Sequence, residues 1–258
     1  MLNEEYDYTQ RPNCNLRITV IALIRIVTIF FYFLLINLTL LVICITRPFH
    51  RDNVHVAGIL YSSISRLLGL RLELRIPDSV KNGGPFVIIA NHQNSYDLLT
   101  ICAAAQKGTV VIGKKSLIWI PVFGQIFWLL GSIIMDRKNS GRDHDTLQST
   151  AQKIKDRRLS VWFFPEGTRS YGRGLLPFKS GAFRIAKATN GAVVTVCASN
   201  LRNKVKLNRW DNGTLIIEAS EPLMMDDSKN IREWSDYFHQ KMEQQIKKIN
   251  LELEQGAG

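Results

Sequence analysis

The chain has 258 residues, 46% of them hydrophobic, and a formal net charge of +11 at pH 7, enough for one catalytic domain and an anchor. The positive charge favours anionic membrane lipid as a partner, and a basic surface that serves only solubility is the alternative. The sequence has no zinc-finger spacing or RNP-like signature, which argues against nucleic acid. The four cysteines and five histidines show no spacing that suits a metal site or a disulfide framework, which indicates a reducing compartment.

The first predicted element is an apolar helix over about residues 18–46. Its twenty residues from Ile26 to Ile45 carry no charge, and a helix of that length can cross a hydrocarbon layer of roughly 30 Å. A cleaved signal peptide fits less well, because the start of the chain is acidic and no small-residue cleavage site follows. Arginines on both sides of the apolar run leave its orientation nearly balanced.

Pro48 ends this helix, and residues 54–70 follow as a second, weaker apolar segment. The two segments could dip into one leaflet as a hairpin. A single spanning helix followed by an ordinary core helix fits the pattern equally well. Residues 1–70 are therefore the predicted membrane anchor, and residues 71–258 the predicted catalytic domain.

Short apolar runs and helical patterns alternate along the rest of the chain, which predicts an α/β fold, a mixed sheet flanked by helices. The last helix is amphipathic and is marked by apolar residues spaced three and four apart from Ile231 to Ile249. The other predicted helices are 98–106, 143–158 and 182–189. The predicted strands are 71–76, 86–90, 109–112, 132–135, 159–164, 192–198 and 214–219.

The segment ANHQNSYD, residues 90–97, follows the buried strand 86–90 and leads into a helix that Asn91 or Ser95 could cap. The carboxyl ends of strands are where open α/β sheets place their sites. His92 could take a proton from a hydroxyl, and Asp97 could orient its ring. Since five residues is not a same-face helical spacing, the two can meet only if the segment starts as a turn. Taken alone, the pattern favours a structural pair over a catalytic one.

The segment GKKSLIWIPVFGQ, residues 113–125, places Lys114 and Lys115 beside a run of bulky apolar side chains. Such a combination suits a lipid interface, where ammonium groups reach phosphates and the stems lie along acyl chains. A core segment flanked by solvated lysines is the equal alternative.

The segment FPEGTRS, residues 164–170, follows another buried strand, and its proline and glycine predict a tight turn. Glu166, Thr168 and Arg169 are expected at the mouth of this turn. Arg169 suits bidentate capture of a phosphate, and Lys179 lies nearby in the sequence. An ordinary turn with exposed charges is the alternative.

Together these segments resemble the glycerolipid acyltransferase family, specifically the bacterial 1-acyl-sn-glycerol-3-phosphate acyltransferases. The resemblance covers nearly the whole chain after the leader. It rests on ANHQNSYD, GKKSL, MDR, FPEGTRS and FKSGAF in this order. It implies a glycerol-3-phosphate acyltransferase-like fold behind a membrane-embedded helix or two-helix hairpin.

The resemblance also implies roles for individual residues. His92 would deprotonate the free sn-2 hydroxyl of 1-acyl-sn-glycerol-3-phosphate, Asp97 would orient His92, and no acyl-enzyme would form. Glu166, Gly167, Thr168 and Arg169 match the family's acceptor-binding motif, in which the arginine meets the phosphate. Lys114 and Arg137 match an intermediate motif that is expected near the same pocket. A start of the helix after Asp97 could supply the oxyanion donor.

The implied reaction is acyl transfer from acyl-carrier protein or coenzyme A to lysophosphatidic acid, giving phosphatidic acid without a cofactor or metal. Its expected place is the cytoplasmic side of a bacterial inner membrane, in contact with anionic lipid. Three rivals stay open: another lysolipid or glycerol-3-phosphate as acceptor, a phospholipid-binding protein without catalysis, and a hydrolase using Ser95 or Cys102. The hydrolase is the weakest, because no G-x-S-x-G elbow is present.

In one place the sequence departs from the family. A proline is expected inside the late apolar strand, where this chain has Thr195. Because valine and threonine favour strands, we expect the strand itself to persist.

Overall fold

The structure is a computed structural model that describes residues 12–135, 143–201 and 204–256. In this part of the chain one seven-stranded sheet has the order β1-β7-β6-β2-β5-β3-β4. All neighbouring strands are parallel except β6 and β7, so the predicted mixed sheet is confirmed. The strands are β1 (Leu70–Arg75), β2 (Phe86–Ala90), β3 (Thr109–Lys114), β4 (Ile133–Met135), β5 (Ser160–Phe163), β6 (Ala192–Ala198) and β7 (Gly213–Ala219).

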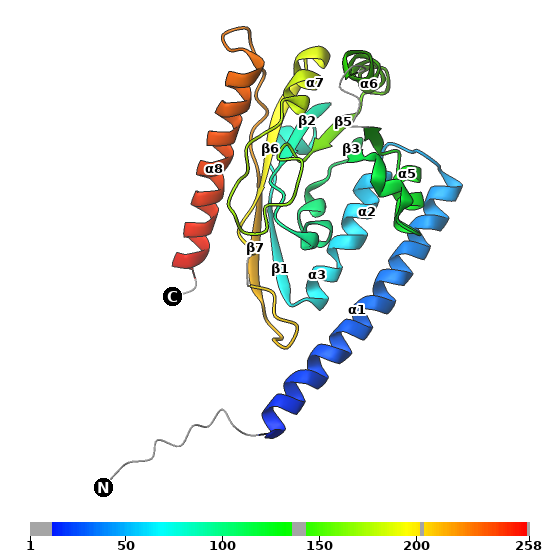
Figure 1. The fold of residues 1–258 in the computed structure, drawn as a ribbon, viewed down its shortest axis with the longest axis vertical. Coiled ribbons are helices and arrows are strands. Elements are labelled where there is room, and N and C mark those ends of the chain that lie inside the picture. The colour runs from blue at the N-terminus through cyan, green and yellow to red at the C-terminus, as the bar shows by residue number, and fades with distance from the viewer. Residues whose placement is uncertain (1–11, 136–142, 202–203, 257–258) are drawn as a thin grey trace.

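Helices cover both faces of the sheet (Figure 1). One face packs against α1 (Pro12–Thr46), α2 (Asn53–Ser62), α3 (Ile64–Leu67), η2 (Ser95–Leu99), η3 (Ile101–Ala104) and α5 (Phe123–Leu129). The other face packs against α6 (Asp143–Arg157), α7 (Gly181–Thr189) and α8 (Ile231–Gln255). Two short helices, α4 (Asp78–Lys81) and η4 (Lys115–Trp119), lie in connections.

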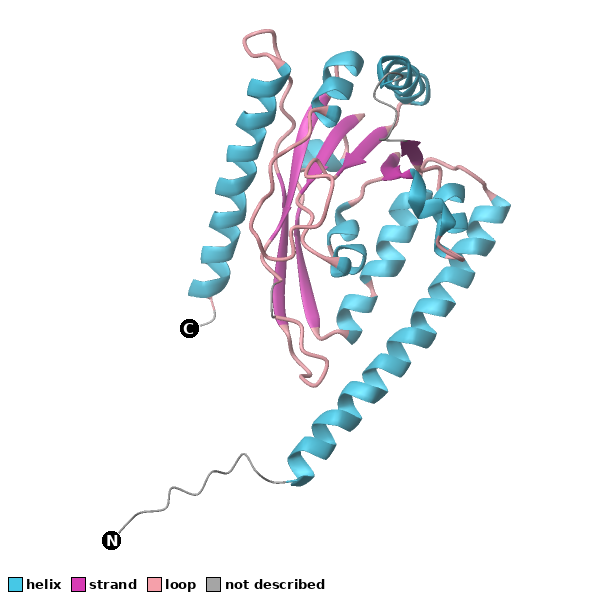
Figure 2. Cartoon of the chain, in the orientation of Figure 1, coloured by secondary structure: helices cyan, strands magenta, loops and turns pink. Residues whose placement is uncertain are grey.

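The sheet lies between helices on its two faces (Figure 2). Because side chains alternate along the strands, the core is divided into two clusters, one on each face. In β2, Ile88 and Ala90 face the α1 side, whereas Val87 and Ile89 face the α8 side. Both sets are buried, which explains why the strand is a continuous apolar run rather than an alternating one. The first cluster also contains Ile36 and Leu40 of α1, so the anchor and the sheet share one core.

Helix α1 contacts the body along most of its length. Cys44 and Leu40 are buried near its carboxyl end. Nearer its amino end, the Arg25 guanidinium donates to the carbonyls of Lys206, Leu207, Arg209 and Trp210. The separation of Arg25 and Cys44 along the helix is roughly 28 Å at 1.5 Å per residue. Residues 20–46 form a helix long and apolar enough to cross a membrane, by length and composition.

Two predictions about local structure have clear outcomes. Thr195 is fully buried inside β6, where its hydroxyl donates to Gln245 at 2.8 Å, so the late strand persists without the proline. The single helix predicted over 98–106 is wrong, because the segment forms the 3-10 helices η2 and η3 instead. Thr100 separates them with φ −135° and ψ −79°, and its hydroxyl bonds the Tyr96 carbonyl.

Candidate active site

His92 and Asp97 contact each other at the carboxyl end of β2. The distance from His92 Nδ1 to Asp97 Oδ2 is 2.6 Å. Asp97 is buried, and 20% of the His92 side chain is exposed. Since an ionised carboxylate only accepts hydrogen bonds, His92 Nδ1 is the donor and Nε2 keeps its lone pair. The ring therefore has the tautomer that a general base needs.

A turn brings the two side chains together, as their spacing predicted. Asp97 Oδ2 also accepts the backbone N–H groups of Gln93 at 2.7 Å and Asn94 at 3.2 Å. Asn94 caps η2 by accepting from Tyr96 N, and Asp97 completes the capping box. The carboxylate is thus fixed by its own loop and by the helix that it begins.

The prediction that Asn91 or Ser95 caps this helix was therefore wrong. The Asn91 amide instead exchanges hydrogen bonds of 3.1 and 2.9 Å with the Ala198 backbone, which joins the ends of β2 and β6. Asn94 is the N-cap because it directly precedes the first helical turn. The N–H groups of Gln93, Asn94, Tyr96 and Asp97 all have acceptors, so these four are not spare donors for an oxyanion.

The Glu166 carboxylate supports the loop that carries His92. Its two oxygens accept His92 N at 2.6 Å and Leu176 N at 2.9 Å. The residue is 3% exposed, and burial raises the pKa of its carboxyl group against the lowering effect of these two bonds. Glu166 was expected at the mouth of the turn. It is buried because its chain folds back under His92.

Further contacts fix the position of His92 relative to the FPEGTRS turn. Its ring stacks on Phe164, with centroids 4.1 Å apart and planes 22° apart. Ser170 N donates to the His92 carbonyl and Tyr171 N to the Gln93 carbonyl, both at 2.8 Å. His92 is therefore held by ring, backbone and carboxylate contacts from one neighbouring segment.

The turn also places two of the expected phosphate ligands. Gly167 has φ +71°, and a Cβ there would lie 2.9 Å from Lys179 Cε and Nζ. Only glycine lets the Lys179 side chain cross the turn so closely. Arg169 donates to the Tyr171 hydroxyl at 3.3 Å, and Thr168 is exposed. Arg169 thus belongs to the same turn as Glu166, and the Lys179 side chain lies against that turn at Gly167.

Strand register places Lys114 at the same edge of the sheet. Val111 of β3 pairs with Trp162 of β5, and Ile89 of β2 pairs with Phe163. The carboxyl ends of β3, at Lys114, and of β2, just before His92, therefore lie at the same edge with β5 between them, two strand spacings or roughly 10 Å apart. Lys114 is exposed. Arg137 follows β4 and lies outside the described residues.

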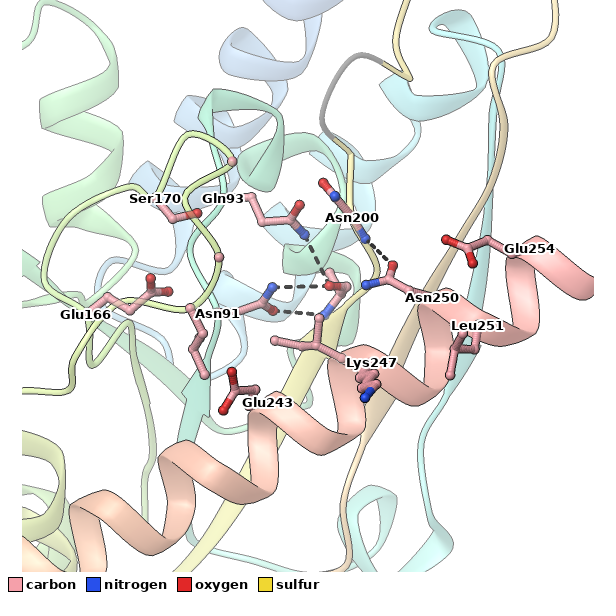
Figure 3. Close-up of a pocket in the computed structure, with 15 residues that line it drawn as sticks. Asn91, Gln93, Glu166, Ser170, Asn200, Glu243, Lys247, Asn250, Leu251 and Glu254 are labelled. Carbon is pink, nitrogen blue, oxygen red and sulfur yellow. Dashed lines mark hydrogen bonds between the residues drawn. The ribbon is translucent and has the colours of Figure 1, made fainter.

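A cavity of about 400 Å³ lies beside the loop that carries His92 (Figure 3). Asn91, Gln93 and Glu166 line one side, and His92 is not among the described residues that line it. The other side is a polar stripe on α8 that includes Lys247 and Asn250. Only the apolar face of this helix was predicted from the sequence. The polar stripe could also have been predicted, because its residues recur three and four positions apart: Glu243, Lys247, Asn250 and Glu254.

Cys102 is not set up as a nucleophile. Burial and the nearby Asp97 raise the pKa of its thiol to about 12, and the thiol donates to the Leu98 carbonyl at 2.7 Å. A protonated thiol is a poor nucleophile toward a carbonyl. In the described part of the chain no three His, Cys, Asp or Glu side chains gather where they could hold a metal ion.

Comparisons with known proteins show which family the chain belongs to. The acyltransferase family model matches residues 71–199, which include His92, Asp97 and the FPEGTRS turn. A 1-acyl-sn-glycerol-3-phosphate acyltransferase of Salmonella typhimurium is 40% identical over 231 residues, covering 89% of this chain and 94% of the relative. The chain belongs to the acyltransferase family.

Another relative and a solved structure show further similarity in sequence and in fold. A 1-acyl-sn-glycerol-3-phosphate acyltransferase of Escherichia coli is 41% identical over 81% of this chain and 86% of its own length. The crystal structure of the 1-acyl-sn-glycerophosphate acyltransferase from Thermotoga maritima matches this acyltransferase with a TM-score of 0.58 at 21% identity. That match covers 77% of this chain and 78% of the other, and it shows that the fold is shared.

Proposed function

We propose that this acyltransferase moves a fatty acyl group from acyl-carrier protein or coenzyme A to the sn-2 hydroxyl of 1-acyl-sn-glycerol-3-phosphate, giving phosphatidic acid. The contact of His92 Nδ1 with Asp97 carries the proposal, because it leaves Nε2 as a positioned base. The similarity to relatives named for this reaction supports the choice of acceptor.

In the proposed reaction His92 Nε2 accepts the proton of the attacking hydroxyl, and the hydroxyl oxygen bonds the thioester carbonyl carbon. Asp97 stabilises the imidazolium that forms. The tetrahedral intermediate collapses by breaking the carbon–sulfur bond. The thiolate leaves with the proton from His92, so the base is regenerated and no acyl-enzyme forms.

The acceptor's phosphate is proposed to bind the cations around the catalytic edge. Arg169 offers a planar fork for two phosphate oxygens, and Lys114, Lys179 and Arg137 complete the proposed set. Gly167 and Thr168 are proposed to shape the turn that carries Arg169. Glu166 contributes by holding His92 and Leu176 in place, since both of its oxygens are already used.

The proposed location is the inner membrane of a bacterium, with the catalytic domain on the cytoplasmic side. The free state of the described cysteines Cys44, Cys102 and Cys197 supports a reducing compartment. Because α1 contacts the body from Arg25 to Cys44, we propose that it lies along one leaflet rather than crossing both. A spanning helix could contact a domain outside the bilayer only near one end.

The deciding experiment is an assay of membranes that contain the full chain, with labelled acyl-carrier protein or coenzyme A thioesters and a panel of acceptors. We expect labelled phosphatidic acid from lysophosphatidic acid. The His92→Ala protein in equal amount is the matched control. Product from glycerol-3-phosphate or a lyso-aminolipid alone would overturn the proposed acceptor.

A further inference from the structure

An exposed apolar corner lies between η4 and α5. Trp119 is 80% exposed, Val122 57%, Trp128 49% and Ile120 44%. These four residues, which we call the η4–α5 corner, place two indole rings and two branched aliphatic side chains in solvent within ten residues. Soluble surfaces seldom gather such side chains without a partner.

The backbone holds the corner in a strained shape. Val122 has φ +65° and ψ −56°, and Phe123 N donates to the Pro121 carbonyl at 2.8 Å. This is a γ-turn of the strained kind, which is rare and especially so for a β-branched residue. The strain does not bury Val122, whose side chain is directed outward. Such strain persists where surrounding structure maintains it and function uses it.

Close packing underneath maintains the turn. A Cβ at Gly124 would lie 2.0 Å from the Ile118 carbonyl oxygen, so only glycine lets α5 begin so near η4. Ile126 and Phe127, on the inner side of α5, are buried. The apolar inner side therefore satisfies the core, and the outer apolar residues are left for another partner.

The corner continues the exposed apolar face of α1. Phe49, just after α1, packs edge-on against Trp128 with centroids 4.8 Å apart, and its N–H donates to the Leu129 carbonyl at 2.9 Å. Figure 1 shows α5 beside the carboxyl end of α1. That end exposes Leu38, Val42 and Ile45. The two elements thus form one apolar surface.

We propose that the η4–α5 corner is a second membrane-inserting element, which enters the same leaflet as α1 and delivers the lipid acceptor sideways to the catalytic edge. Its partner is the acyl-chain region of a phospholipid bilayer. Lys114 and Lys115, exposed where η4 begins, would lie at the phosphate level. Lys114 also ends β3, whose carboxyl end lies roughly two strand spacings from that of β2, just before His92. The delivery role rests on the proposed function, whereas insertion does not.

Insertion is tested by tryptophan fluorescence of the full chain in vesicles of phosphatidylethanolamine and phosphatidylglycerol whose acyl chains carry bromine. All proteins carry Trp210→Phe, which removes the other strongly exposed indole. We expect the brominated chains to quench a large share of the emission, and Trp119→Phe with Trp128→Phe to remove most of that share. Trp234→Phe, at a buried position on α8, is the control and should leave it unchanged.

Equal quenching with and without the two corner indoles would overturn insertion. Insertion would also be overturned if the emission of Trp119 and Trp128 shifted with protein concentration in the absence of lipid and was not quenched by brominated acyl chains. That result would identify a second copy of the chain as the partner. This measurement needs no acyl transfer, so failure of the proposed function would leave its outcome readable.

Delivery is tested by Trp119→Glu with Val122→Glu. We expect the apparent KM for a long-chain acceptor in vesicles to rise about tenfold, with the KM for a short-chain soluble acceptor unchanged. Met224→Glu, at an apolar position 49% exposed in the connection before α8, is the matched control and should change neither. Equal rises in both KM values would overturn delivery, because they would place the corner's effect within the acceptor site itself.

Discussion

The two sides of the proposed acceptor site are built differently. On the base side, Asp97 and Glu166 are each 3% exposed and are held by backbone N–H groups at 2.6 to 3.2 Å. On the anion side, Lys114 and Lys179 are exposed and Arg169 is only partly buried. The proposed base is therefore fixed by the fold itself, whereas the proposed phosphate ligands have room to adjust. We expect changes on the base side to act on kcat and changes on the anion side to act on KM.

The largest effect is expected from His92→Ala. Removing the base should lower kcat by about 10³-fold or more, since a positioned general base contributes about 10²–10⁴-fold. Binding of lysophosphatidic acid to vesicle-bound protein should change less than threefold, roughly, because no anion ligand is lost. Initial rates over a range of acceptor concentrations, with an equilibrium binding measurement, separate the two. Wild-type turnover by this variant would rule out His92 as the base.

Asp97→Asn should have the next largest effect and sharpens the distinction between base and support. The amide retains the volume of the side chain but lacks the negative charge that favours the three donors now converging on Oδ2. We expect kcat to fall about 10²-fold, because the wrong tautomer of His92 becomes available. KM should stay within about twofold. A loss confined to KM would place Asp97 on the anion side.

Glu166→Gln tests whether the support is structural. One of the two N–H groups loses its acceptor, so we expect a loss of stability of about 1–3 kcal/mol and a smaller decrease in kcat than for Asp97→Asn. Chemical denaturation followed by circular dichroism measures the first. Unchanged stability with a raised acceptor KM would return Glu166 to the phosphate site.

The pH dependence of this variant has a defined sign. Burial raises the pKa of Glu166 in the folded protein above its ordinary 4.5. Folding thus favours the protonated form of Glu166. The contribution of this form to the free energy of unfolding is fully present below pH 4.5 and is lost as the pH rises through the folded pKa. The stability advantage of wild type over Glu166→Gln should therefore narrow as the pH increases from about 4.5, and a widening gap would contradict the stated cause.

The same division explains what the sequence could predict. The strand ending at Ala90 and the turn between His92 and Asp97 depend on neighbouring residues, so their pattern indicated both. The burial of Glu166 depends on a partner 74 positions away in the chain. No local pattern specifies such a contact, and a glutamate in a turn is usually exposed.

Capping was missed for a related reason. Asn91, Asn94 and Ser95 are all competent caps, and the choice depends on where the first helical turn begins, which local propensity fixes only within a few residues. The backbone carbonyl and N–H of Ala198 engage the Asn91 amide, and Asn94 is left to cap the helix. The γ-turn at Val122 was also unpredictable, because its sequence favours an extended residue and only the close approach of η4 to α5 imposes the positive φ.

The smallest effect is expected from Arg169→Ala, and it tests the anion side directly. Loss of the guanidinium should raise the acceptor KM about tenfold, the size of one charge-assisted contact in a partly exposed site, and should leave kcat within about threefold. Arg169→Lys should recover part of the loss, because an ammonium keeps the charge but not the planar fork. Arg184→Ala, an exposed arginine on α7, is the control for a general change of charge. If Arg169→Ala lowered kcat as much as Asp97→Asn, the guanidinium would act in the transition state, and the division between the two sides would not hold.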